Sequence, residues 1–143
     1  MTRRVLILCT GNSARSQMAE GFFRELGGAR YEVFSAGTYP SVVNPYAIEA
    51  MREVGIDISG HRSKSVDEFA GQSFDLVITV CDFAAERCPL FPGSPQRIHW
   101  SLPDPTASGS HEQKLAEFRS IRDELAALIG GFLAGSKSAP ALS

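Results

Sequence analysis

The spacing of apolar residues along the chain follows two periods, and it predicts four strands with helices between them. The clearest strand covers residues 74–80, a nearly continuous apolar and β-branched run that is typical of a strand buried on both faces of a parallel sheet. Shorter runs of the same kind predict the other three strands, over residues 4–8, 31–35 and 97–100.

A helical period is strongest between residues 112 and 133. Its apolar positions form one stripe that we expect to face the core: Leu115, Phe118, Ile121, Leu125, Leu128, Ile129 and Phe132. A second helix is predicted over 16–26, where a pair of glycines ends it. A third begins at Pro45, directly after an Asn cap, and ends at Gly55, and a weaker one covers 66–70.

Strands that alternate with helices favour an α/β fold, here a three-layer sandwich in which a four-stranded parallel sheet carries helices on both faces. We expect one domain over residues 1–134 and a flexible tail over 135–143. Sheets of this kind bind ligands at the carboxyl ends of their strands. Cys9 and Cys81 each follow a predicted strand, so both are expected at that edge of the sheet.

Composition narrows the possible partners. The 143 residues include 21% charged and 43% hydrophobic residues and carry a net charge of −2, which does not favour binding to nucleic acid or to an anionic membrane. No apolar run approaches the ~20 residues needed to span a bilayer. Three cysteines, an odd number, do not make a structural disulfide framework, and we expect a cytoplasmic protein with at least one free thiol.

Residues 9–16 join the first predicted strand to the first predicted helix, with the sequence CTGNSARS. The N–H groups of such a turn, the positive end of a helix and a guanidinium together bind a tetrahedral anion, and the same field favours a thiolate. A Cys that ends a strand is, by itself, most often a core residue. Here it stands in a strand–loop–helix context with a glycine and an arginine at fixed spacing, which argues against that interpretation. We therefore predict Cys9 as a nucleophile within an oxyanion loop formed by Thr10, Gly11, Asn12, Ser13, Ala14 and Arg15.

Two further thiols, Cys81 and Cys88, are seven positions apart. Within one helix that spacing is ~10 Å, whereas the Cα atoms of a disulfide are ~4.4–6.8 Å apart, so pairing requires the segment to unwind. The spacing is poor for zinc and the three histidines are scattered, so no metal site is expected. The alternative to a redox pair is that Cys81 and Cys88 are two unrelated thiols. Asp104 precedes a proline, which indicates either an ordinary turn or an acid at the same edge of the sheet.

From residue 5 to about 128 the chain resembles the thioredoxin-coupled arsenate reductases of the low-molecular-weight protein tyrosine phosphatase-like family. The resemblance rests on residues 9–16 and the Gln17-Met18-Ala19-Glu20 that follows, and on several shorter matches: Ser35-Ala36-Gly37, Asn44-Pro45-Tyr46-Ala47, Ile56-Asp57-Ile58-Ser59, Cys81 with Cys88-Pro89, His99-Trp100 and Asp104-Pro105. The oxyanion loop alone is shared with phosphatases, and the paired thiols favour the reductase.

The resemblance implies a mechanism. Cys9 attacks arsenate held by the loop and Arg15, Ser16 bonds the thiolate, and Asp104 protonates the departing oxygen. Cys81 then attacks the sulfur of Cys9 and releases arsenite, and Cys88 resolves the resulting disulfide for thioredoxin. The resemblance also implies a monomer without a cofactor, and it implies that phosphate and sulfate compete with arsenate for the oxyanion loop.

Two positions depart from relatives. Asn12, Glu20 and Ser35 match a potassium site that some relatives carry, but Lys64 stands where its acidic ligand would be, so potassium is not expected. Thr106 follows Asp104-Pro105 where phosphatases usually carry an aromatic residue, which favours a small inorganic oxyanion. The alternatives are a low-molecular-weight protein tyrosine phosphatase and a non-catalytic module that binds oxyanions or senses redox state.

Overall fold

The computed structural model describes residues 2–86, 88–89, 91–93, 95–105 and 109–138. Its sheet has four parallel strands in the order β2-β1-β3-β4. They are β1 (Arg3–Cys9), β2 (Tyr31–Gly37), β3 (Leu76–Thr79) and β4 (Gln96–His99). All four predicted strands are confirmed, with ends that lie at most two residues from those expected.

The helices also follow the predicted order. They are α1 (Arg15–Gly27), α2 (Pro45–Arg52), α3 (Asp82–Glu86) and α4 (His111–Ser138), with the 3₁₀ helices η1 (Gly28–Arg30) and η2 (Val66–Phe69). The side chain of Asn44 caps α2 by accepting a hydrogen bond from the Tyr46 amide at 2.8 Å, as expected of this position.

Several elements differ from the sequence prediction. Helix α2 ends at Arg52, before the expected Gly55, and η1 was not predicted. The segment predicted as a weak helix over 66–70 is the single 3₁₀ turn η2, and α3 was not predicted. Helix α4 continues to Ser138, so residues 135–138 of the expected tail are helical, while 139–143 lie outside the described residues. A lone glycine at 135 lowers helix propensity without ending the helix, and the first proline beyond it is residue 140.

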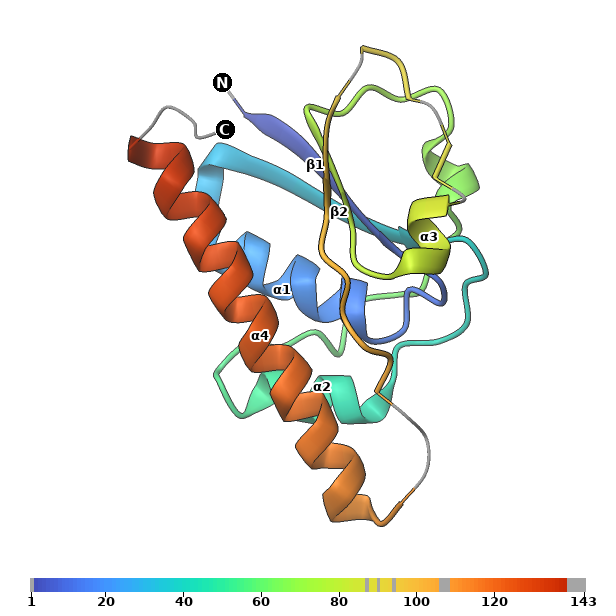
Figure 1. Cartoon of the computed structure of the whole chain (residues 1–143), viewed down its shortest axis with the longest axis vertical. Helices are drawn as coiled ribbons and strands as arrows, with labels where there is room; N and C mark the ends of the chain where they lie inside the picture. Colours follow the sequence, from blue (N-terminus) through green and yellow to red (C-terminus); the bar gives the residue numbers. More distant parts are fainter. Residues whose placement is uncertain (1, 87, 90, 94, 106–108, 139–143) are drawn as a thin grey trace.

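The sheet is covered on both faces. Helices α1, α2 and α4 pack together on one face (Figure 1), where Phe23, Met51 and Leu125 are fully buried. On the other, the ring of Phe69 in η2 packs against Phe34 and Phe74, with ring centroids 5.5 and 5.9 Å apart. The short helix α3 contacts β1 and β3 near their carboxyl ends. This places the residues that follow β1, β3 and β4 at one edge.

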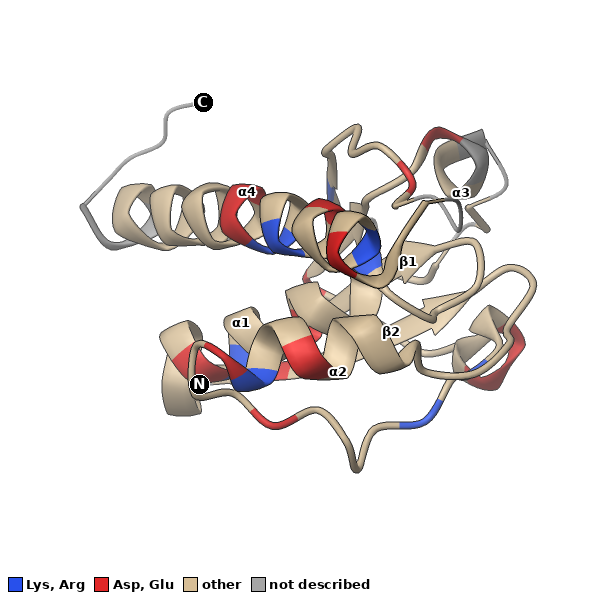
Figure 2. Cartoon of the chain, turned by 90° about the horizontal axis from the view of Figure 1, so that it is seen from below, with Lys and Arg blue, Asp and Glu red and all other residues tan. Residues whose placement is uncertain are grey.

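Most charged residues of α4 lie in its amino-terminal half. Blue and red residues intermingle along the amino-terminal part of α4, whereas residues 125–136 of the helix include no charged residue (Figure 2). Within the described residues no helix is both long and apolar enough to cross a membrane.

Candidate active site

Cys9 is the last residue of β1, and its sulfur is buried at the base of the loop that leads into α1. Its Sγ atom lies 2.9 Å from the Oγ atom of Ser16, and the residue is 2% exposed. A cavity of about 230 Å³ opens above the loop. It is lined by Cys9, Thr10, Gly11, Ser13, Ala14, Arg15, Asn44, Asp104, Pro105 and Phe118. The predicted oxyanion loop therefore borders a space large enough for a tetrahedral anion.

The backbone of the loop is oriented by the segment after β2. The amides of Tyr39, Ser41 and Asn44 donate to the carbonyls of Thr10, Gly11 and Ser13 at 2.8, 3.0 and 2.9 Å. Because the N–H and C=O of a trans peptide point in opposite directions, each of these carbonyls turns the following N–H away from this segment. N–H groups that face away from this segment in a series can bind an anion in a loop of this kind.

Asn12 supports the loop from below and does not line the cavity. It is fully buried with φ at +48°, a left-handed conformation that Asn tolerates better than most residues. Its Nδ2 donates to the hydroxyls of Ser16 and Ser35 at 2.8 and 2.9 Å, and its Oδ1 accepts from Gln17 and from the Lys64 amide, both at 2.9 Å. Asn12 and Ser16 thus hold the shape of the loop.

Arg15 connects the loop to the segment after β4. Its side chain is only 11% exposed, its Nη1 donates to the carbonyl of Leu102 at 3.1 Å, and its Nη2 lies 3.6 Å from Oδ1 of Asp104. The carboxylate itself is 80% exposed at the mouth of the cavity. The structure therefore brings Asp104 to the loop, while Thr106 lies outside the described residues.

The second thiol lies beside the first residue of the loop after Cys9. Cys81 is 4% exposed, and its Sγ atom is 3.2 Å from Oγ1 of Thr10. Cys88 is partly exposed and lies beyond the end of α3, so the two cysteines flank a short helix instead of sharing one. Separation along a single helix, which the sequence suggested as an obstacle to pairing, therefore does not apply.

His99 was not among the residues predicted for the site, yet its side chain connects β4 with β3 and α3. Its Nδ1 is 2.7 Å from Oγ1 of Thr79 on β3, and its Nε2 is 2.8 Å from Oδ1 of Asp82 in the first turn of α3. The hydroxyl of Ser101 donates to the same carboxylate oxygen at 3.0 Å. The hydrogen bond from His99, followed by that from Ser101, lowers the pKa of Asp82 below its usual value. His99 lies within the strand predicted over 97–100 and in the His99-Trp100 match to the family, but neither signal predicted this contact.

The residues that match a potassium site are bonded to one another. Glu20, 4% exposed, accepts from the Ser35 hydroxyl and pairs with Arg24 at 2.7 Å. Lys64 is half-buried and donates from Nζ to the carbonyl of Arg62 at 2.9 Å, and burial lowers its pKa. Because these oxygens already have partners and a cation occupies the fourth position, the set does not fit a bound potassium ion.

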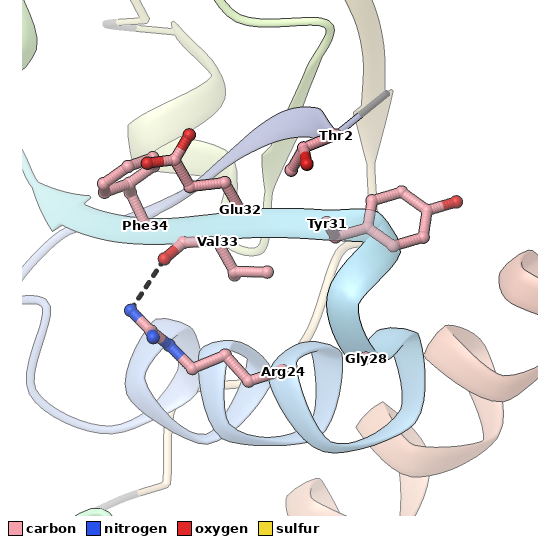
Figure 3. A pocket seen from close by; sticks show the side chains of 7 residues that line it. All are labelled: Thr2, Arg24, Gly28, Tyr31, Glu32, Val33 and Phe34. Atoms are coloured by element: carbon pink, nitrogen blue, oxygen red, sulfur yellow. Dashed lines mark hydrogen bonds between the residues drawn. The ribbon is translucent and has the colours of Figure 1, made fainter.

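A larger cavity, of about 540 Å³, lies away from the cysteines along the free edge of β2 (Figure 3). There Arg24 reaches from α1 and donates from Nη2 to the carbonyl of Val33 at 2.8 Å. The guanidinium thus occupies a backbone acceptor on an edge strand, which protects such an edge from pairing with another chain. None of the cavity's lining residues belongs to the predicted site.

Comparison with known proteins identifies relatives of the whole fold. Residues 4–139 match the family model "Low molecular weight phosphotyrosine protein phosphatase". The chain is 46% identical over 134 residues to an arsenate reductase of Halalkalibacterium halodurans, with 92% of this chain and 96% of that protein covered. It is also 46% identical over 122 residues to an arsenate reductase of Bacillus subtilis, with 85% and 88% covered.

Solved structures agree with these relatives. An arsenate reductase in its oxidised state superposes with a TM-score of 0.79 at 34% identity, with 93% of this chain and 98% of that one covered. A thioredoxin-dependent arsenate reductase of Corynebacterium glutamicum gives 0.64 at 28% identity, covering 94% and 64%. A low-molecular-weight protein tyrosine phosphatase from T. tengcongensis gives 0.74 at 29% identity, covering 93% and 99%.

Proposed function

Because the chain belongs to the low-molecular-weight phosphotyrosine protein phosphatase family, among its arsenate reductases, we propose that it reduces arsenate to arsenite through a relay of Cys9, Cys81 and Cys88. The observation that carries the proposal is the contact of 3.2 Å between Cys81 Sγ and Thr10 Oγ1. It keeps a second, buried thiol against the residue that directly follows Cys9. A phosphatase needs no second thiol there.

In the first step the thiolate of Cys9 attacks arsenic. A sulfur–arsenic bond forms and an arsenic–oxygen bond breaks, and the oxygen leaves as water with a proton supplied by Asp104. Ser16, 2.9 Å from the sulfur, stabilises the thiolate before attack. Arg15 and the loop amides hold the remaining oxygens of the adduct.

In the second step Cys81 replaces the water that a phosphatase would admit. Its thiolate attacks the sulfur of Cys9, a disulfide forms, and the sulfur–arsenic bond breaks with both electrons left on arsenic. Arsenic is thereby reduced from the +5 to the +3 state while two thiols are oxidised. Cys88 then attacks Cys81, releases Cys9 as a thiolate and carries the disulfide to a more exposed position.

We propose a dithiol of thioredoxin as the reductant that returns Cys81 and Cys88 to thiols. The thioredoxin dependence of the Corynebacterium glutamicum structure supports this choice. The enzyme is then a cytoplasmic monomer whose three free thiols suit a reducing compartment, with phosphate and sulfate competing for the loop.

The test is NADPH oxidation that depends on arsenate in the presence of thioredoxin and its reductase. The wild type turns over, and Cys81→Ser or Cys88→Ser stops turnover while each keeps the slow hydrolysis of an aryl phosphate that needs only Cys9, Arg15 and Asp104. Cys9→Ser abolishes both activities. Turnover by Cys88→Ser at the wild-type rate would rule out the three-thiol relay, and rapid aryl phosphate hydrolysis without arsenate reduction would identify a phosphatase.

A further inference from the structure

Arg97, on strand β4, places its guanidinium against the third thiol of the relay. Its Nη1 donates to Sγ of Cys88 at 2.9 Å, and its Nη2 donates to the carbonyl of Pro89 at 3.1 Å. The planar guanidinium thus donates one hydrogen bond to the thiol and another to the carbonyl of the next residue. A lysine ammonium does not reproduce this geometry.

Besides its contact with Arg97, the thiol of Cys88 donates to the carbonyl of Pro89 at a longer distance, 3.6 Å. A cavity of about 200 Å³ beside Cys88 is lined by Val77, Thr79, Ala85, Cys88, Arg97, Ile98 and His99, and none of these described residues is acidic. The imidazole of His99, which also lines this cavity, has both ring nitrogens engaged by Thr79 and Asp82. A positive charge in contact with a thiol favours the thiolate, which is the form that attacks a disulfide.

We propose that Arg97 is a catalytic residue of the third step, where it holds Cys88 as a thiolate and fixes its position. This inference rests on the relay proposed above. In that step the sulfur of Cys88 bonds to that of Cys81, the bond between Cys81 and Cys9 breaks, and Cys9 leaves with the electron pair as a thiolate. The exchange involves no net oxidation, and the proton of Cys88 goes to solvent because a guanidinium cannot accept it.

The first experiment measures Cys88 alone. In a Cys9→Ser/Cys81→Ser background, the rate of alkylation by iodoacetamide at pH 7 reports the thiolate fraction of Cys88. Arg97→Gln is expected to lower that rate by about two- to fivefold, the range for a solvent-exposed ion pair, and Arg97→Lys to recover part of the loss. At about pH 10.5, where thiols are ionised without help, the rates of all variants are expected to converge.

Arg52→Gln is the matched control, because Arg52 pairs with Glu49 within α2, away from this cavity. An unchanged alkylation rate in Arg97→Gln at pH 7 would overturn the proposal. A deficit of equal size at both pH values would also overturn it, since that result means a structural effect on access and not on ionisation.

The second experiment follows one turnover with arsenate in the absence of thioredoxin. Arg97→Gln is expected to release arsenite at the wild-type rate, because release needs only Cys9 and Cys81, but to convert the Cys9–Cys81 disulfide to Cys81–Cys88 more slowly by the same two- to fivefold factor. Conversion at the wild-type rate would contradict the role of Arg97. Absence of arsenite from the wild type would instead contradict the relay, and the alkylation result would still stand.

Discussion

Gly37 is the residue through which β2 approaches the oxyanion loop most closely. A Cβ atom at this position would lie 2.5 Å from the carbonyl oxygen of Thr10 and 2.8 Å from the amide nitrogen of Asn12. Both are backbone atoms, so the loop itself would have to move. We expect Gly37→Ala to lower kcat/KM for arsenate by about 100-fold, since a displacement of ~1 Å in a positioning group has that effect.

The matched control for Gly37→Ala is Gly60→Ala. A Cβ atom at Gly60 would meet no other atom within 4 Å, and φ is not positive there. Steady-state kinetics of the coupled reductase assay compares the two variants. Wild-type activity in Gly37→Ala would mean that the loop backbone does not need its present position for catalysis, and a loss in Gly60→Ala would make the comparison invalid.

Helix α3 depends on its neighbours because an isolated helix of five residues is not stable in water. The bonds from His99 and Ser101 to Asp82 attach its first turn to β4 and the segment that follows. We expect His99→Ala to speed amide hydrogen exchange in α3 and to slow turnover severalfold, with the KM for arsenate unchanged because the oxyanion loop is intact.

A double-mutant cycle with Asp82→Ala tests this attachment. If His99 acts through Asp82, the double variant is no slower than the more impaired single variant, because both remove the same contact. Additive losses in turnover would show that His99 acts elsewhere. Faster exchange throughout the sheet would show instead that the substitution unfolds the core.

The helices and strands, and the part of the site around Cys9, could be predicted because their sequence signals are local. The strand, loop and helix around Cys9 are contiguous, and the cap at Asn44 follows from its own side chain and the proline after it. The contacts of Arg97 and His99 could not be predicted in this way. They depend on the registration of β4 beside β3 and on where α3 ends, which are set by packing between segments 9 to 20 residues apart.

Glu53 joins two helices of the same face of the sheet, and its charge contributes to the stability of the whole molecule. As the C-cap of α2 it pairs with Arg119 of α4 at 2.6 Å and with Arg122 at 2.9 Å. The hydrogen bond from Arg119, together with that from Arg122, outweighs desolvation and lowers the pKa of Glu53 from 4.5 to about 2. A carboxyl whose pKa is lower in the folded state stabilises that state when ionised.

This contribution has a defined pH window. It is fully present above pH 4.5, the value for the unfolded chain, and is lost as the pH falls toward about 2. We expect Glu53→Gln to melt a few degrees below the wild type at pH 7, with the difference vanishing near pH 2. Glu49→Gln is the control. Its carboxylate pairs directly with Arg52 within α2 and acts on Arg119 only at longer range, so this variant should show a smaller difference at pH 7. A difference between wild type and Glu53→Gln that stays constant from pH 7 to pH 2 in thermal denaturation would exclude an electrostatic origin. The side chain of Glu53 would then join the helices by packing alone.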